Sequence, residues 1–302
     1  MKRIKAAAIQ IAPSTEALSH QSIKSNVSRT IDLVMKCVKE TNPDLIVLPE
    51  TVTTGFVTGK SPSELWDLID DKYILEPFQN LAKLLSVHIV HASYSRGEEK
   101  NEILNSSWVL LPDGSIGGKY NKTHPFCTEN VCNGGWVTAG TEVCVTETQL
   151  GKIGMVICFD GDFPELSRIQ ALMGAEIIAR PSALLRSADI WELTTRARAY
   201  DNHVFFIGAN AIGSDPQGTY YFGNSLIVDP IGTVIARATS HESWITAILD
   251  PETAMKSLSS GSSVGQPFDH LNDRNLELLD RYSEVLKAGG STSFNYSRPK
   301  SR

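Results

Sequence analysis

Cys158 stands at the junction between an apolar run and the predicted start of a helix. Residues 151–158 read GKIGMVIC, which is typical of a buried strand. FDGDFPE follows, in which Gly161 permits a sharp turn and Pro164 suits a first helical position. A thiol placed there has positive partial charge and backbone N–H groups nearby, which favour a reactive nucleophile, although a buried core cysteine would show the same pattern. Asp160 and Asp162 are suited to cap the predicted helix.

Glu50 and Lys122 are a carboxylate and an amine that could act with this thiol. Glu50 ends the apolar run PDLIVLPE, at the point where the chain must leave the core. Lys122 lies in GKYNKTHPF, directly after a predicted hairpin. Taken singly, each residue fits an exposed loop position, because most Glu and Lys side chains are solvated.

Together, the three segments resemble the nitrilase superfamily of carbon–nitrogen hydrolases. DLIVLPE, YNKTHPF and GMVICFDGDFPE occur in the order in which that family carries its Glu-Lys-Cys triad. The likeness extends from residue 4 to about residue 250, and it includes Ala8-Ile9-Gln10 in the first strand and RARAYDNHVFFIGAN at residues 196–210. One departure is Asp201, where the family commonly has Glu before the Asn.

The resemblance implies a mechanism that is also chemically reasonable. Glu50 takes the proton of Cys158 and later activates water, which is the second substrate. The thiolate attacks an amide carbonyl, and Lys122 with the backbone N–H of Phe159 stabilises the oxyanion. An amine or ammonia leaves, and water hydrolyses the thioester. The scheme requires no metal and no organic cofactor.

Further pocket residues are expected from the same resemblance. Many members carry a second glutamate shortly after the lysine, for which Glu129 is the candidate and Glu142 the rival. The segment Arg180-Pro181-Ser182-Ala183 follows another strand, as the pocket-lining segment of the family does. Phe159, Ala183 and Trp191 are therefore expected to contact substrate.

The segment around residues 127–140 is rich in Gly, Trp and Cys and offers two other hypotheses. His124, Cys127, Cys132 and Cys144 invite a zinc site, but their intervals lack the paired close spacings of common structural sites. His124 also permits a papain-like Cys-His scheme, but the local context of Cys158 is not of that type. We favour a loop that borders the pocket and selects the substrate.

Strand-like and helix-like runs alternate along the chain. Helical periodicity covers residues 23–38 and 75–85, and further helices are expected at 164–173 and 189–201. Two predicted hairpins, at Pro112-Asp113-Gly114 and Asp229-Pro230-Ile231-Gly232, indicate a mixed sheet. The strand-like runs are residues 4–11, 45–48, 88–94, 106–111, 153–158, 177–179, 204–209, 225–228 and 246–249.

The resemblance implies an α/β fold, the four-layer α-β-β-α sandwich, which usually pairs through its helical face. We therefore expect a carbon–nitrogen hydrolase domain over residues 1–260 and a homodimer or higher homo-oligomer. Residues 261–302 are expected to form a polar C-terminal extension at a subunit interface, with one amphipathic piece near 276–286 and a loosely held end from Gly289.

Composition excludes several classes of function. The 302 residues are 41% hydrophobic and 21% charged, which is ordinary for a globular protein. A net charge of −6 without a long basic tract gives no footprint for nucleic acid or an anionic membrane. The N-terminal apolar run is too short for a signal peptide, and no run is long enough to span a membrane. Five cysteines without a secretory signal indicate reduced thiols and a cytoplasmic location.

Within the family, nitrile-specific members typically follow the nucleophile with Trp-Glu, whereas Phe159-Asp160 follows here. The sequence therefore favours an amidase acting on a small-molecule carboxamide, with an N-carbamoyl amine or amino-acid amidohydrolase as the alternative. A catalytically silent scaffold of the same fold is the third hypothesis, and the complete triad argues against it.

Overall fold

Two six-stranded sheets form the centre of the part of the chain that the structure, a computed structural model, describes: residues 1–12, 16–185, 187–252 and 268–288. The first sheet has the order β14 (Ser243–Leu249), β1 (Ile4–Gln10), β2 (Leu45–Val47), β3 (His88–Arg96), β4 (Ile103–Leu110) and β5 (Ile116–Asn121). The second has the order β13 (Val234–Arg237), β12 (Leu226–Val228), β9 (Phe205–Asn210), β8 (Ile177–Ser182), β7 (Gly151–Met155) and β6 (Val145–Thr148). Both are mixed, with parallel pairing in β1-β2-β3 and β7-β8-β9.

Strand β1 shows why the sheets pack in layers. Its residues alternate between two faces, because successive side chains of a strand point in opposite directions. Ala6 and Ala8 enter the core between the two sheets, together with Met155 of β7. Ala7 and Ile9 enter a second core beneath the helices. A strand buried on both faces reads as a continuous apolar run, as residues 6–9 of this strand do.

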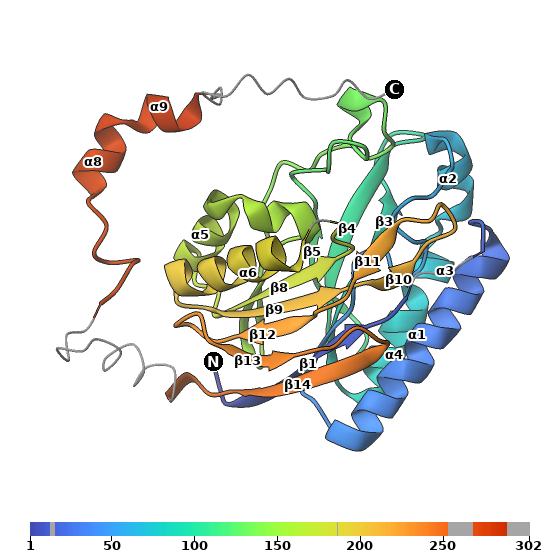
Figure 1. Cartoon of the computed structure of the whole chain (residues 1–302), viewed down its shortest axis with the longest axis horizontal. Helices are drawn as coiled ribbons and strands as arrows, with labels where there is room; N and C mark the ends of the chain where they lie inside the picture. The colour runs from blue at the N-terminus through green and yellow to red at the C-terminus, as the bar shows by residue number, and fades with distance from the viewer. Residues whose placement is uncertain (13–15, 186, 253–267, 289–302) are drawn as a thin grey trace.

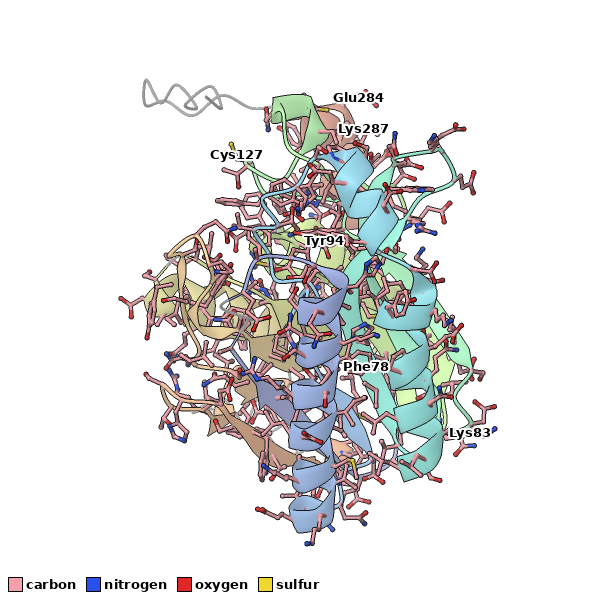
Figure 2. The ribbon with its side chains drawn as sticks, turned by 90° about the vertical axis from the view of Figure 1, so that its right-hand side faces the viewer. Phe78, Lys83, Tyr94, Cys127, Glu284 and Lys287 are labelled. Carbon is pink, nitrogen blue, oxygen red and sulfur yellow. The ribbon has the colours of Figure 1, made fainter. Side chains whose placement is uncertain are left out.

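Helices cover the outer faces of both sheets (Figure 1). On the first sheet lie α1 (His20–Thr41), α2 (Pro62–Leu68), α3 (Asp71–Ile74) and α4 (Glu76–Leu85); on the second lie α5 (Pro164–Leu172) and α6 (Ala188–Asn202). Ser19 and Ser22 form a capping box at the start of α1, and Asn42 ends it in the left-handed conformation. Figure 2 looks onto α1 and α4, where the buried ring of Phe78 faces inward. The expected four-layer sandwich is confirmed.

The element boundaries refine the sequence prediction at three places. The strand expected to run to Cys158 ends at Met155, and Cys158 instead opens a 3-10 turn, η2 (Cys158–Asp162). The hairpin predicted at Pro112-Asp113-Gly114 implied a return strand, which is β5, whereas β6 and the small ribbon of β10 (Ile212–Ser214) and β11 (Tyr220–Phe222) were not predicted. Their short, partly exposed runs lack the continuous apolar signal of the central strands.

The C-terminal part carries two short helices, α8 (Leu276–Arg281) and α9 (Ser283–Lys287), where an amphipathic piece was expected. They extend away from the sandwich in Figure 1, with exposed apolar side chains. The end predicted to be loosely held, from Gly289 onward, lies outside the described residues. Among the described helices, none combines the length and the hydropathy needed to cross a membrane.

Candidate active site

Three strands of the two sheets bring the candidate catalytic residues to one place. Glu50 follows β2 after two residues, and Lys122 follows directly after the last residue of β5. Cys158 follows β7 after two residues, with a φ of 50°, in a region that few non-glycine residues adopt. A backbone held in this region indicates a position that the surrounding structure over-determines, as is common at functional sites.

Lys122 lies between two carboxylates. Its Nζ is 2.7 Å from Oε1 of Glu50 and 2.8 Å from Oε2 of Glu129, and all three side chains are fully buried. Asn105 of β4 bridges the same pair, since its Nδ2 donates to Oε1 of Glu50 at 2.7 Å and to Oε1 of Glu129 at 2.8 Å. The structure thus places the candidate second glutamate, Glu129, beside Lys122. The four side chains form what we call the lysine cluster.

The charges within the lysine cluster shift one another's pKa values. Burial alone would lower the pKa of Lys122, but the carboxylates of Glu129 and Glu50 outweigh this effect and raise it. Burial raises the pKa of Glu129; Lys122 opposes the rise and the charge of Glu50 adds to it. The lysine is therefore held as a cation, and paired charges with well-formed hydrogen bonds can remain in the interior.

Asn105 was not singled out from the sequence. Its signal in the sequence is an amide within β4, beside two serines, and such a residue becomes informative once it is known to be fully buried. The remaining carboxylate oxygen of Glu50, Oε2, accepts the backbone N–H of Ala183 at 2.9 Å. Glu50 is thereby fixed from both sheets at once.

The thiol of Cys158 is buried on the other side of the site. Burial and then the negative charge of Glu50 raise its pKa, whereas Lys122 and Arg180 lower it. The net effect is a thiol that is neutral at ordinary pH, so that nucleophilic attack needs a base to take its proton. A nearby carboxylate such as Glu50 can supply that base.

Two hollows meet at the site and share Phe56 and Ala183. One contains Cys158 and is lined by Phe56, Phe126, Cys158, Phe159, Ala183, Leu184 and Leu185. The other contains Glu50, and its lining includes Ile11, Val52, Ala211 and Tyr221. The candidate contact residues Phe159 and Ala183 thus lie in the wall beside the thiol. Apolar walls with few polar groups are typical of small-molecule sites.

Trp191, the third candidate contact residue, is placed elsewhere. Its side chain is fully buried, its Nε1 donates to the carbonyl of Asn224 at 2.7 Å, and its ring lies 4.8 Å from the guanidinium of Arg180. It lines neither of the two hollows described above. Trp191 supports the layer beneath the site through α6.

Asp160 does not cap α5, contrary to the sequence-based expectation. The N-cap of that helix is Phe163, which makes no side-chain capping bond. The carboxylate of Asp160 instead accepts the backbone N–H of Ile157 at 2.9 Å, the hydroxyl of Tyr120 at 2.8 Å and the backbone N–H of His124 at 2.9 Å. It therefore joins the segment that carries Lys122 to the turn that carries Cys158.

The other candidate residues are dispersed. The ring of His124 stacks on Phe163, with centroids 3.8 Å apart, and the thiol of Cys127 lies toward the surface (Figure 2). Glu142, the rival second glutamate, lines a separate surface hollow together with Cys144. Across the described ranges, no group of three or more His, Cys, Asp or Glu side chains is arranged to hold a metal ion.

Comparison with known proteins agrees with this fold. The carbon–nitrogen hydrolase family model matches residues 5–256. The chain therefore belongs to the carbon–nitrogen hydrolase family, within the nitrilase superfamily, and is a hydrolase acting on carbon–nitrogen bonds other than peptide bonds.

Similar proteins include fungal and bacterial members. A probable nitrilase of Schizosaccharomyces pombe is 32% identical over 76% of this chain and 82% of its own length. An omega-amidase of Saccharomyces cerevisiae is 29% identical over 83% of this chain and 88% of its own length. The crystal structure of a carbon–nitrogen hydrolase from Helicobacter pylori superposes with a TM-score of 0.79 at 27% identity, covering 95% of this chain and 99% of that one.

Proposed function

We propose that the protein is an amidase that hydrolyses a small-molecule carboxamide through a thioester on Cys158. The observation that carries the proposal is the lysine cluster, with Lys122 Nζ at 2.7 Å from Glu50, assembled next to a buried thiol at the wall of a hollow. Such a group supplies a base, a nucleophile and a fixed positive charge for a developing oxyanion.

In the acylation half of the reaction, Glu50 takes the proton from Sγ of Cys158. The thiolate forms a bond to the carbonyl carbon of the amide, and the carbonyl oxygen takes up the negative charge. Lys122 Nζ and the backbone N–H of Phe159 stabilise that oxygen. The carbon–nitrogen bond then breaks, the amine leaves with the proton held by Glu50, and a thioester remains.

In the deacylation half, Glu50 takes a proton from a water molecule. The hydroxide attacks the thioester carbonyl, the same donors stabilise the oxyanion, and the carbon–sulfur bond breaks. The proton returns to Sγ of Cys158 and the carboxylic acid leaves. Glu129 and Asn105 act by position, since they hold Lys122 and Glu50 in register throughout both halves.

The hollow that contains Cys158 favours an uncharged acyl group. Its described lining is aromatic or aliphatic apart from the thiol, with Phe56, Phe126 and Leu184 among the side chains. A buried carboxylate on the substrate would need a paired cation. We therefore propose short aliphatic or aromatic carboxamides as the substrates, in contrast to the ω-amide of a dicarboxylic acid suggested by the name of the yeast relative.

Ammonia release by the purified protein tests the proposal. The panel contains propionamide, isobutyramide, benzamide, succinamate, N-carbamoyl amino acids and benzonitrile, each with the Cys158→Ala variant alongside. We expect release from the uncharged amides at least about tenfold faster than from succinamate, since a buried unpaired carboxylate costs several kcal/mol. The variant should release none.

Each other result selects a different function. Release from carbamoyl compounds alone would establish the N-carbamoyl amidohydrolase, and release from succinamate alone would establish an omega-amidase. Activity retained by Cys158→Ala would remove the mechanism altogether. A silent wild type over the whole panel would favour a scaffold role.

We also propose a homodimer that pairs through α5 and α6. These helices carry exposed apolar side chains, with Ile169 45%, Leu172 48% and Leu193 61% exposed, and such side chains are typical of an interface. Leu193→Lys should convert the dimer to monomer in sedimentation equilibrium, whereas Leu84→Lys, at a 71% exposed position of α4, should not. A monomeric wild type, or a dimer unaffected by Leu193→Lys, would contradict this pairing.

A further inference from the structure

A buried arginine lies directly beneath the nucleophile turn. Arg180, on β8, is fully buried, and its guanidinium binds the backbone carbonyl of Cys158 twice: Nε donates at 2.9 Å and Nη2 at 2.7 Å. Two N–H groups of one cation that converge on one carbonyl oxygen hold that oxygen in place and so restrict the orientation of its peptide group.

The surroundings hold this guanidinium in place mainly with neutral groups. Nη1 donates to the hydroxyls of Thr194 at 2.8 Å and Thr195 at 3.1 Å, and the ring of Trp191 lies 4.8 Å away. Asp162 is a more distant acidic contact, with Oδ1 at 3.3 Å from Nη2. Burial lowers the pKa of Arg180 to about 10, so the group remains a cation at neutral pH.

Gly161 leaves the space that the guanidinium occupies. A Cβ at this position would lie 2.2 Å from Cζ of Arg180, which no real contact allows. The turn that carries the nucleophile is therefore shaped around the arginine. A cation buried with few charged partners costs stability, and apolar residues would pack the same volume more favourably. Its presence calls for a role in the site.

The carbonyl that Arg180 binds shares its peptide unit with the N–H of Phe159. The peptide group is planar and conjugated, so a positive charge on its oxygen draws electron density away from its nitrogen. The N–H at the other end becomes a stronger donor, as hydrogen bonds in a chain polarise one another. The N–H of Phe159 is the backbone donor assigned to the oxyanion in the proposed mechanism.

We propose that Arg180 is a positioning residue that orients and polarises the Cys158–Phe159 peptide, so that the N–H of Phe159 binds the oxyanion of the acylation and deacylation steps. The inference rests on the proposed amidase function. Arg180 should therefore affect the rate at which Cys158 reacts with carbonyl substrates in particular. Reactions of the same thiol that develop no oxyanion should be insensitive to the fork geometry of the guanidinium.

The test compares two reactions of Cys158 in one set of variants. Hydrolysis of the best carboxamide of the panel develops an oxyanion. Modification by methyl methanethiosulfonate does not: the thiolate forms a sulfur–sulfur bond and methanesulfinate leaves. The rate of this modification is followed from pH 5 to 10 by mass spectrometry of the peptide containing Cys158, because the chain has other free cysteines.

Three variants separate the possible roles. Arg180→Lys keeps the charge and removes the two-pronged donor. Gly161→Ala displaces the guanidinium without changing it, and serves also if the lysine variant fails to fold. Arg196→Met is the control, because Arg196 is an exposed arginine of α6 that binds the carbonyl of Gly232 at 2.8 Å and the half-buried Glu192.

We expect kcat/KM for the amide to fall about tenfold or more in Arg180→Lys and Gly161→Ala, since loss of a whole oxyanion donor costs on the order of a hundredfold or more. The rate and pH profile of thiol modification should change by less than about threefold in Arg180→Lys, because the charge is retained. Arg196→Met should behave as wild type in both reactions.

Two results would overturn the inference. One is an amide kcat/KM of Arg180→Lys and Gly161→Ala within twofold of wild type. The other is an equal loss in both reactions, which would assign Arg180 to thiol ionisation or to folding alone. Failure of the amidase proposal would appear separately, as a wild-type protein that turns over no amide in the panel.

Discussion

The two sides of the site bury charge in opposite ways. In the lysine cluster, the ammonium group of Lys122 lies within 2.8 Å of each of two carboxylates, and the three charges influence one another's protonation. Beneath the nucleophile turn, Arg180 is held chiefly by carbonyl and hydroxyl oxygens and determines the geometry of the backbone. Buried charge can thus control either the protonation states of the side chains in a site or the backbone geometry of that site. Substitutions on the two sides should therefore impair the activity and stability of the protein in different ways.

Cys158→Ala should give the largest effect on activity. Removal of the nucleophile should lower kcat for the amide by at least about a thousandfold, while the thermal midpoint changes by only a few degrees. Cys37→Ala is the matched control, because Cys37 is a fully buried thiol of α1. It should keep full activity and lose similar stability. A Cys158→Ala protein that keeps more than about a thousandth of the wild-type kcat would contradict covalent catalysis.

Lys122→Met should give the largest effect on stability, and the effect should depend on pH. Two buried carboxylates would face each other without the cation, which costs about 3–5 kcal/mol at neutral pH. Glu129 already has a raised pKa, and loss of Lys122 would raise it further. An acid with a raised folded-state pKa stabilises the fold below its unfolded pKa and loses that contribution as the pH rises through the folded value.

The free-energy difference between Lys122→Met and wild type should therefore be largest at pH 7.5 and should narrow as the pH falls toward 4.5. Urea unfolding at several pH values measures it. For Arg180→Met, the comparison predicts a loss that is nearly constant over the same range, because its main partners do not titrate there. A free-energy difference between Lys122→Met and wild type that does not change with pH would contradict this contrast between the two sides of the site.

Glu129→Gln should affect activity more than stability. The amide keeps a hydrogen-bond acceptor for Lys122 and removes one of the two negative charges that burial disfavours. We expect a loss of about tenfold to a hundredfold in kcat/KM and a change in unfolding free energy within about 1 kcal/mol. Steady-state kinetics and urea unfolding of the same variant measure the two effects. A large loss of unfolding free energy with unchanged kcat/KM would mean that Glu129 serves stability and not activity.

Tyr120→Phe should give the smallest effect and tests the link between the two sides. The substitution removes the hydroxyl that donates to Asp160 at 2.8 Å, while Asp160 keeps the N–H groups of Ile157 and His124. A loss of about 1 kcal/mol in unfolding free energy is expected. In a double-mutant cycle with Glu129→Gln, an activity coupling indistinguishable from zero would mean that Asp160 does not transmit position between the sides.

The sequence predicted the sheets better than it predicted the supports of the site. Central strands such as β1 and β9 are continuous apolar runs, and Cys158 was recognisable from the turn and proline beside it. Asn105 was not recognised, and Arg180 was expected only as part of a pocket-lining segment. Each is a polar residue within a strand, and its role depends on its burial and on a partner distant in sequence. Trp191 was predicted to line the pocket because it follows that segment, but its position on α6 places its side chain beneath the site.

The pairing of β1 with β14 has a consequence for how the protein is made. Ile4 lies opposite Leu249, so the first strand of the chain receives one of its two neighbours only when nearly the whole domain has left the ribosome. Until then, an apolar strand presents an open hydrogen-bonding edge, which is a template for association between nascent chains. Synthesis that stops before residue 243 should yield aggregates rather than a smaller folded enzyme. Folding of the domain therefore depends on a strand that is made near its end.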